Sequence, residues 1–149
     1  VSSTPGKTQR LNYFLVNEQF HIVDLPGYGF ARVPEAMREQ WRRMMQGYLR
    51  SRPQLLGLLQ LVESRHEPSR EDRQMVEWLR AQQLPFCTIA TKMDKLRRGE
   101  RQKALRVITS VLALSPEQAP VPHSSQTGEG RDAILAWIKR TLTTPASRT

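Results

Sequence analysis

Five segments of the chain have the hydrophobic pattern of β-strands. They span residues 11–16, 20–23, 55–62 and 85–90, with a short fifth strand at Val121. A turn at Asn17 and Glu18 joins the first two segments, which predicts an antiparallel hairpin. The third and fourth segments are unbroken apolar runs, as expected for strands that are buried on both faces of a parallel sheet.

Four other segments have helical periodicity, with apolar residues recurring every three or four positions. They span residues 35–50, 69–80, 101–114 and 130–142. Pro34 stands where the first helix can begin, and Ser69 with Asp72 has the spacing of a capping box. The periodicity predicts these inward-facing residues: Met37, Trp41, Met44 and Tyr48; Leu105, Ile108 and Leu112; Ile134, Ile138 and Leu142.

This order of elements predicts an α/β fold. A hairpin followed by alternating strands and helices favours a three-layer domain with a mixed, mostly parallel sheet. We expect one domain over residues 1–142 and a disordered tail over residues 143–149. Ligands of such sheets bind at the carboxyl ends of the strands, so residues that follow a strand are the first candidates for a site.

Asp24 and Gly27 form a DxxG pattern at the end of the second strand. A carboxylate there can hold Mg²⁺ through the water shell of the ion, and the glycine lets the backbone approach a terminal phosphate. An ordinary turn is the alternative interpretation, because DxxG alone is a weak pattern. Thr8 enters the first strand from a loop and is placed to bring its hydroxyl to the same Mg²⁺.

The residues Thr91 to Asp94, with the sequence TKMD, are a more specific pattern after a buried strand. The Asp94 carboxylate can accept from guanine N1–H and from the exocyclic amine, a donor pair that adenine lacks. The Lys92 stem can lie over the base and the sugar. Ser124 and Ser125 follow the last strand, where backbone N–H groups can point at guanine O6. The ordered series of DxxG, TKxD and SS predicts a guanine-nucleotide site, and a solvated loop is the alternative for TKMD.

A phosphate-binding loop of the GxxxxGK[ST] type is not predicted, although Gly6-Lys7-Thr8 resembles its end. The first glycine of that pattern would fall at Val1, and residues 9–16 alternate like a strand where a helix should begin. The chain also has no Ser/His/Asp or Cys/His arrangement that can be argued, so no catalytic residue is assigned. His21, His66 and His123 lack metal-ligand spacing.

The charge balance favours a polyanionic partner. The chain has 23 Lys and Arg residues against 14 Asp and Glu residues, a net charge of +9. RNA is the commonest partner of such a surface, and a basic soluble protein without a nucleic-acid role is the alternative. The single cysteine, Cys87, excludes a disulfide framework, suits a reducing cytosol and is expected to be a small buried hydrophobe. No apolar run approaches the roughly 20 residues that cross a bilayer, so a membrane partner is not expected.

Several motifs together resemble the EngB-type GTPases. They are Ser3-Thr4-Pro5-Gly6-Lys7-Thr8, VDLPGYGFA around Asp24, RHEP at residues 65–68 with Asp72, and TKMDKL from Thr91. The combination is far more specific than any single GTPase motif. The resemblance runs from residue 2 to about residue 142. It implies a cytoplasmic, monomeric GTPase that binds GTP or GDP with Mg²⁺. It also implies a role in maturation of the large ribosomal subunit, with ribosomal RNA as partner, and a link to cell division and septation.

Two departures from the family, and one from many other small GTPases, qualify this interpretation. Glu63 stands where the family usually has aspartate before its Arg-His. The GRSNVGKS-type phosphate loop, with the first strand and first helix, has no counterpart in these residues. We therefore expect residues 1–149 alone to be inactive, with a strand-wide gap between the strand ending at Asp24 and the strand 55–62. Tyr28 replaces the water-orienting glutamine of many small GTPases, so we expect slow hydrolysis, helped by a monovalent cation such as K⁺ or by the ribosome.

Two other functions stay open on the sequence. The first is a non-catalytic, basic RNA-binding or assembly module derived from a GTPase fold. The second is an ATP-dependent P-loop enzyme, which the TKxD pattern opposes because its carboxylate suits guanine.

Overall fold

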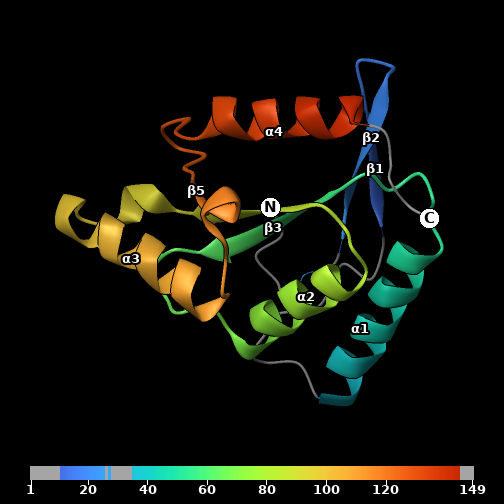
Figure 1. Cartoon of the computed structure of the whole chain (residues 1–149), viewed down its shortest axis with the longest axis horizontal. Coiled ribbons are helices and arrows are strands. Elements are labelled where there is room, and N and C mark those ends of the chain that lie inside the picture. The colour runs from blue at the N-terminus through green and yellow to red at the C-terminus, as the bar shows by residue number, and fades with distance from the viewer. Residues whose placement is uncertain (1–10, 26, 28–34, 145–149) are drawn as a thin grey trace. The chain divides into compact units, whose positions relative to one another are not determined.

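The computed structural model describes residues 11–25, 27 and 35–144. The chain divides into two compact units, residues 1–55 and residues 56–149, and each is described by itself. The elements, labelled in Figure 1, are β1 (Asn12–Val16), β2 (Phe20–Asp24), α1 (Glu35–Arg50), β3 (Leu58–Glu63), α2 (Arg70–Ala81), β4 (Phe86–Thr91), η1 (Met93–Lys95), α3 (Arg98–Val111), η2 (Pro116–Gln118), β5 (Val121–Pro122) and α4 (Arg131–Thr143). This series confirms the predicted α/β fold.

The first unit is a hairpin with one helix. Strands β1 and β2 pair antiparallel, and Asn17 and Glu18 between them both have positive φ, 50° and 55°. Positive φ at both central residues defines the type I′ turn, whose twist matches that of the paired strands. Helix α1 contacts the hairpin through Tyr48, whose hydroxyl accepts a 3.0 Å hydrogen bond from the Tyr13 hydroxyl.

The buried face of α1 differs from the predicted one. Met45 and Leu49 are buried, whereas Met44 is 39% exposed and Tyr48 is only half-buried. Successive helical positions are about 100° apart, so the choice between Met44 and Met45 depends on which side meets the hairpin. Met37 and Trp41 were also predicted to face inward, and their side chains lie outside the described part of the structure.

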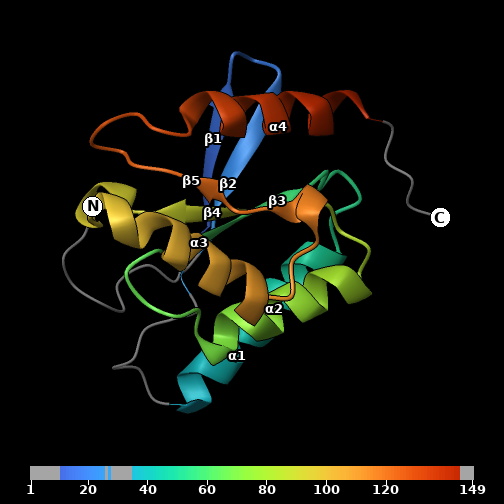
Figure 2. The ribbon, with the colours of Figure 1, turned by 60° about the vertical axis from the view of Figure 1, so that its left-hand side comes forward.

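The second unit is a three-layer sandwich. Its parallel sheet has the order β3-β4-β5, with Leu58 opposite Phe86 and Ile89 opposite Val121. Helix α4 covers one face of this sheet, and α2 and α3 cover the other (Figure 1 and Figure 2). The core residues with almost no exposure are Leu49 in the first unit and Val76, Leu79, Ala90, Met93 and Ile108 in the second. Cys87 is 7% exposed, which confirms it as a buried hydrophobe.

Hydrogen bonds at the helix starts explain why the cap of α2 was predicted correctly and the start of α3 was not. Ser69 and Asp72 form the predicted capping box of α2, with the Ser69 hydroxyl accepting from the Asp72 N–H at 3.1 Å. Helix α3 begins at Arg98, three residues before the predicted start, because the Glu100 carboxylate accepts from the Arg97 N–H at 3.0 Å. That cap adds a polar first turn, which apolar periodicity does not detect.

The predicted inward position of Leu142 is wrong, since its side chain is 38% exposed. Helix α4 meets the sheet where a Cβ on Gly57 would lie 2.7 Å from the Trp137 ring and 3.0 Å from a methyl of Thr141. This close approach brings Trp137 and Thr141 against the residue that precedes β3, whereas Leu142 remains exposed. Glycine at position 57 therefore permits α4 to pack closely.

Among the described residues, the hairpin and the parallel sheet are separate sheets. The strand-wide gap between them stays a prediction, because the two units are described separately. No helix in the described part of the chain is long and apolar enough to cross a membrane.

Candidate functional site

Two loops meet at the carboxyl ends of β4 and β5. The Met93 N–H donates to the His123 carbonyl at 3.1 Å, and the His123 N–H donates to the Ala90 carbonyl at 2.8 Å. Lys92, at the start of the first loop, has the left-handed backbone conformation with φ of 58°. Such a conformation is uncommon for a lysine and requires support from its surroundings. These hydrogen bonds join the two predicted base-binding segments into one structure.

Ser124 holds Asp94 across these loops. The Ser124 hydroxyl donates a 2.7 Å hydrogen bond to Asp94 Oδ1 and accepts from the N–H groups of Gln126 at 3.2 Å and Thr127 at 3.3 Å. Ser124 is fully buried, so its hydroxyl has a fixed set of partners. The Ser124 hydrogen bond is the largest cause of a lowered Asp94 pKa, and the Lys95 ammonium contributes. The site therefore holds an oriented, ionised carboxylate near neutral pH.

Two glycines shape the loop from Ser124 to Gly130. The Ser124 N–H donates to the Glu129 carbonyl at 3.2 Å, and the Gly128 N–H donates to the Ser124 carbonyl at 2.9 Å. Gly128 and Gly130 have φ of 78° and 77°, and a Cβ on Gly130 would lie 2.1 Å from the Pro122 carbonyl oxygen. Position 130 thus requires glycine. Ser125, at the outer side of this loop, is exposed.

Glu63 is a site residue to which the sequence assigned no role. It ends β3 directly opposite Thr91 in the parallel register, and its Oε2 accepts a 2.7 Å hydrogen bond from Lys92 Nζ. Arg65 also donates to Glu63, through Nε at 2.5 Å. Partial burial raises the pKa of Glu63, but the hydrogen bonds from Lys92 and Arg65 outweigh it and lower that pKa. Glu63 therefore anchors the head of the lysine whose stem is predicted to cover the base.

Arg101 is a second residue that sequence reasoning missed. Its guanidinium, on α3, is ion-paired with Glu129 in the second loop and donates to the Met93 carbonyl in the first at 3.5 Å. Nothing in the local sequence pairs residues 101 and 129, so only the fold reveals this connection between the two loops.

Of the two predicted Mg²⁺ ligands, the structure describes only Asp24. Asp24 ends β2 with an exposed side chain that accepts from Asn12 Nδ2 at 3.4 Å. Gly27 is exposed as well, and Thr8 lies outside the described residues. An exposed carboxylate with one long hydrogen bond fits the needs of Mg²⁺, which takes one or two protein oxygens and completes its shell with water and phosphate. No group of three or more His, Cys, Asp or Glu side chains in the described part of the chain could hold a metal by itself.

The α/β fold and a family comparison define the class of the protein. Residues 1–92 match the family model described as "50S ribosome-binding GTPase". A solved structure titled as a probable GTP-binding protein engB has the same fold, with a TM-score of 0.76 over 89% of this chain and 82% of that chain. Its sequence identity is 15%, so this likeness concerns the fold alone. The chain is a domain of the P-loop GTPase type.

Curated relatives give the narrower assignment. The probable GTP-binding protein EngB of Pelotomaculum thermopropionicum is 48% identical over 94% of this chain and 71% of its own length. The protein of the same name from Bacillus subtilis (strain 168) is 42% identical over 95% of this chain and 73% of its own length. The chain belongs to the EngB family of GTP-binding proteins.

Proposed function

We propose that the intact protein is a guanine-nucleotide switch that hydrolyses GTP slowly and serves assembly of the large ribosomal subunit. The observation that carries the nucleotide assignment is the Asp94 carboxylate, which Ser124 orients at 2.7 Å and keeps ionised. Thr91 and Lys92 complete the same loop, and Lys92 is anchored on Glu63 at 2.7 Å. A fixed carboxylate beside a fixed lysine suits recognition of guanine by two hydrogen bonds and a stacked alkyl stem.

The remaining roles complete the switch. Ser124 and Ser125 support the base, and Thr8 and Asp24 hold Mg²⁺. Gly27 approaches the γ-phosphate, so the loops 1–10 and 27–35 report the bound nucleotide to a partner. Mg²⁺ supplies charge neutralisation at the phosphates, while hydrolysis relies on a helper such as K⁺ or the ribosome. Ribosomal RNA is the proposed partner of a monomer acting in the cytoplasm, and a link to cell division follows from the family resemblance.

Exchange of the base-reading carboxylate tests the nucleotide assignment. The wild-type intact protein should prefer GDP over ADP by roughly 10²-fold to 10⁴-fold, since guanine can donate two charge-assisted hydrogen bonds to Asp94 that adenine cannot. Asp94→Asn should weaken GDP and accept XDP, because the xanthine C2 carbonyl can receive the new amide N–H. Competition binding with GDP, ADP and XDP measures this.

Asp132→Asn is the matched control, because Asp132 is an exposed carboxylate in the first turn of α4. It should leave the order of affinities unchanged. Equal affinity of the wild type for GDP and ADP would refute the assignment. RNA binding without any nucleotide binding would favour the non-catalytic RNA-binding module instead.

A further inference from the structure

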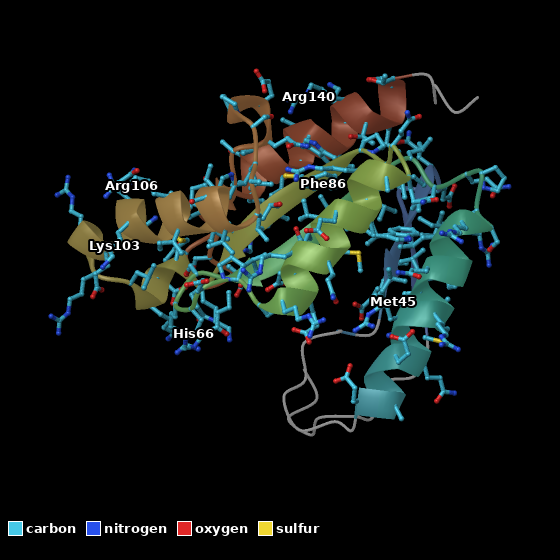
Figure 3. All side chains as sticks on the ribbon, turned by 60° about the horizontal axis from the view of Figure 1, so that its bottom comes forward. Met45, His66, Phe86, Lys103, Arg106 and Arg140 are labelled. Carbon is cyan, nitrogen blue, oxygen red and sulfur yellow. The ribbon has the colours of Figure 1, made fainter. Side chains whose placement is uncertain are left out.

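Helix α3 presents a purely basic and polar face to solvent. Arg98, Lys103 and Arg106 are exposed, and Gln102 lies between them. At about 100° per residue these four positions fall within an arc of about 140°, and Glu100, the only acidic residue of α3, lies outside it. Figure 3 shows Lys103 and Arg106 on the outer side of α3. We call Arg98, Gln102, Lys103 and Arg106 the α3 face.

The three cations of the α3 face form no ion pair with any described residue. Arg42 and Arg43 of α1, by contrast, both pair with Glu39, the latter at 3.1 Å. A net positive charge by itself does not locate a binding surface. Exposed cations without an ion pair also occur on α4, at Arg131 and Lys139, but Asp132 lies beside Arg131 on that helix. The α3 face differs because its three cations share one arc that holds no acidic residue, so their charge is not balanced among the described residues.

The chemistry of this face selects the partner. The face carries no apolar side chain, whereas the centre of a protein interface is enriched in aromatic residues and methionine. A helix that lies on a membrane also needs an apolar side. Arg98 and Arg106 are eight residues apart, which is about 12 Å along the helix, so the three cations can meet successive phosphates of one strand.

We propose that the α3 face is the surface on which the phosphate backbone of RNA docks. The choice of RNA rests on the proposed ribosomal function, and the placement on α3 rests on the unpaired cations. Gln102 adds a neutral donor and acceptor that can reach a phosphate oxygen or a ribose hydroxyl.

The test uses a triple variant of the intact protein, Arg98→Gln, Lys103→Gln and Arg106→Gln, with a large-subunit ribosomal RNA fragment as probe. Loss of three phosphate contacts should weaken binding roughly 10²-fold at about 0.1 M salt and reduce the slope of log K against log salt by about two. The matched control removes the same charge elsewhere, by Arg73→Gln on α2 with Arg131→Gln and Lys139→Gln on α4, all exposed positions. The control should retain most of the affinity.

Equal losses in both triple variants would overturn the proposal, because bulk charge would then explain binding. A DNA duplex of the same length that binds as tightly through the same residues would overturn the choice of RNA. GDP binding by the same samples separates the two proposals. If GDP binds but RNA binding does not depend on the α3 face, only the docking surface is refuted. If RNA binding depends on the α3 face but GDP does not bind, only the switch is refuted.

Discussion

Ser124→Ala removes the hydroxyl that orients the base-reading carboxylate. The substitution deletes a 2.7 Å charge-assisted hydrogen bond to Asp94 and takes the acceptor away from the N–H groups of Gln126 and Thr127. A hydrogen bond to a charged group stabilises more than one between neutral groups. Without it Asp94 must be oriented when guanine binds, so GDP affinity should fall roughly 10-fold to 150-fold.

The same substitution should change the titration of Asp94. Its pKa in the folded protein is lowered, first by the Ser124 hydrogen bond. A folded pKa below the unfolded value means stabilisation that is present above the unfolded pKa, about 3.9, and is lost as pH falls through the folded pKa. Ser124→Ala should move the Asp94 pKa upward toward that unfolded value and shrink the loss of stability in acid.

Two measurements check this reasoning. Calorimetric GDP titration gives the affinity, and carboxyl carbon NMR against pH gives the Asp94 pKa. Ser110→Ala is the matched control, because Ser110 is exposed on α3 and its side chain has no role in the site. GDP affinity that is unchanged in Ser124→Ala, together with an unmoved Asp94 pKa, would refute the role assigned to the Ser124 hydroxyl.

Two further predictions concern Lys92 and the chain itself. Glu63→Gln keeps the shape of the side chain but replaces the charged acceptor of the 2.7 Å hydrogen bond from Lys92, so GDP affinity should fall about 3-fold to 10-fold. Glu67→Gln, at an exposed position nearby, is its control, and equal effects of the two changes in a GDP titration would contradict the anchoring role. Residues 1–149 contain no GxxxxGK[ST] loop, so this stretch alone should not bind GTP tightly. They also contain no counterpart of the family's first strand, so this stretch alone should not unfold cooperatively. Each backbone N–H or C=O group left unpaired by the missing strand costs about 1–3 kcal/mol, against a total stability of about 5–15 kcal/mol. Cooperative denaturation together with tight GTP binding would disprove the prediction.

The sequence alone determined the elements whose evidence is local. Helical periodicity gave α1 its observed bounds, Glu35–Arg50, and the spacing of Ser69 and Asp72 predicted a capping box that forms. These features depend on residues three or four positions apart, so they can be read without knowledge of the fold. The TKxD and SS patterns also fall at strand ends, as predicted.

Only the tertiary structure decided how those residues work together. The hydrogen bonds from Ser124 to Asp94 and from Lys92 to Glu63 join residues 30 and 29 positions apart. The parallel register of β3, β4 and β5 brings these pairs to one edge of the sheet, and no local pattern specifies that register. The exposure of Met44 and Leu142 follows from the same cause, because the side of a helix that is buried depends on the surface it packs against.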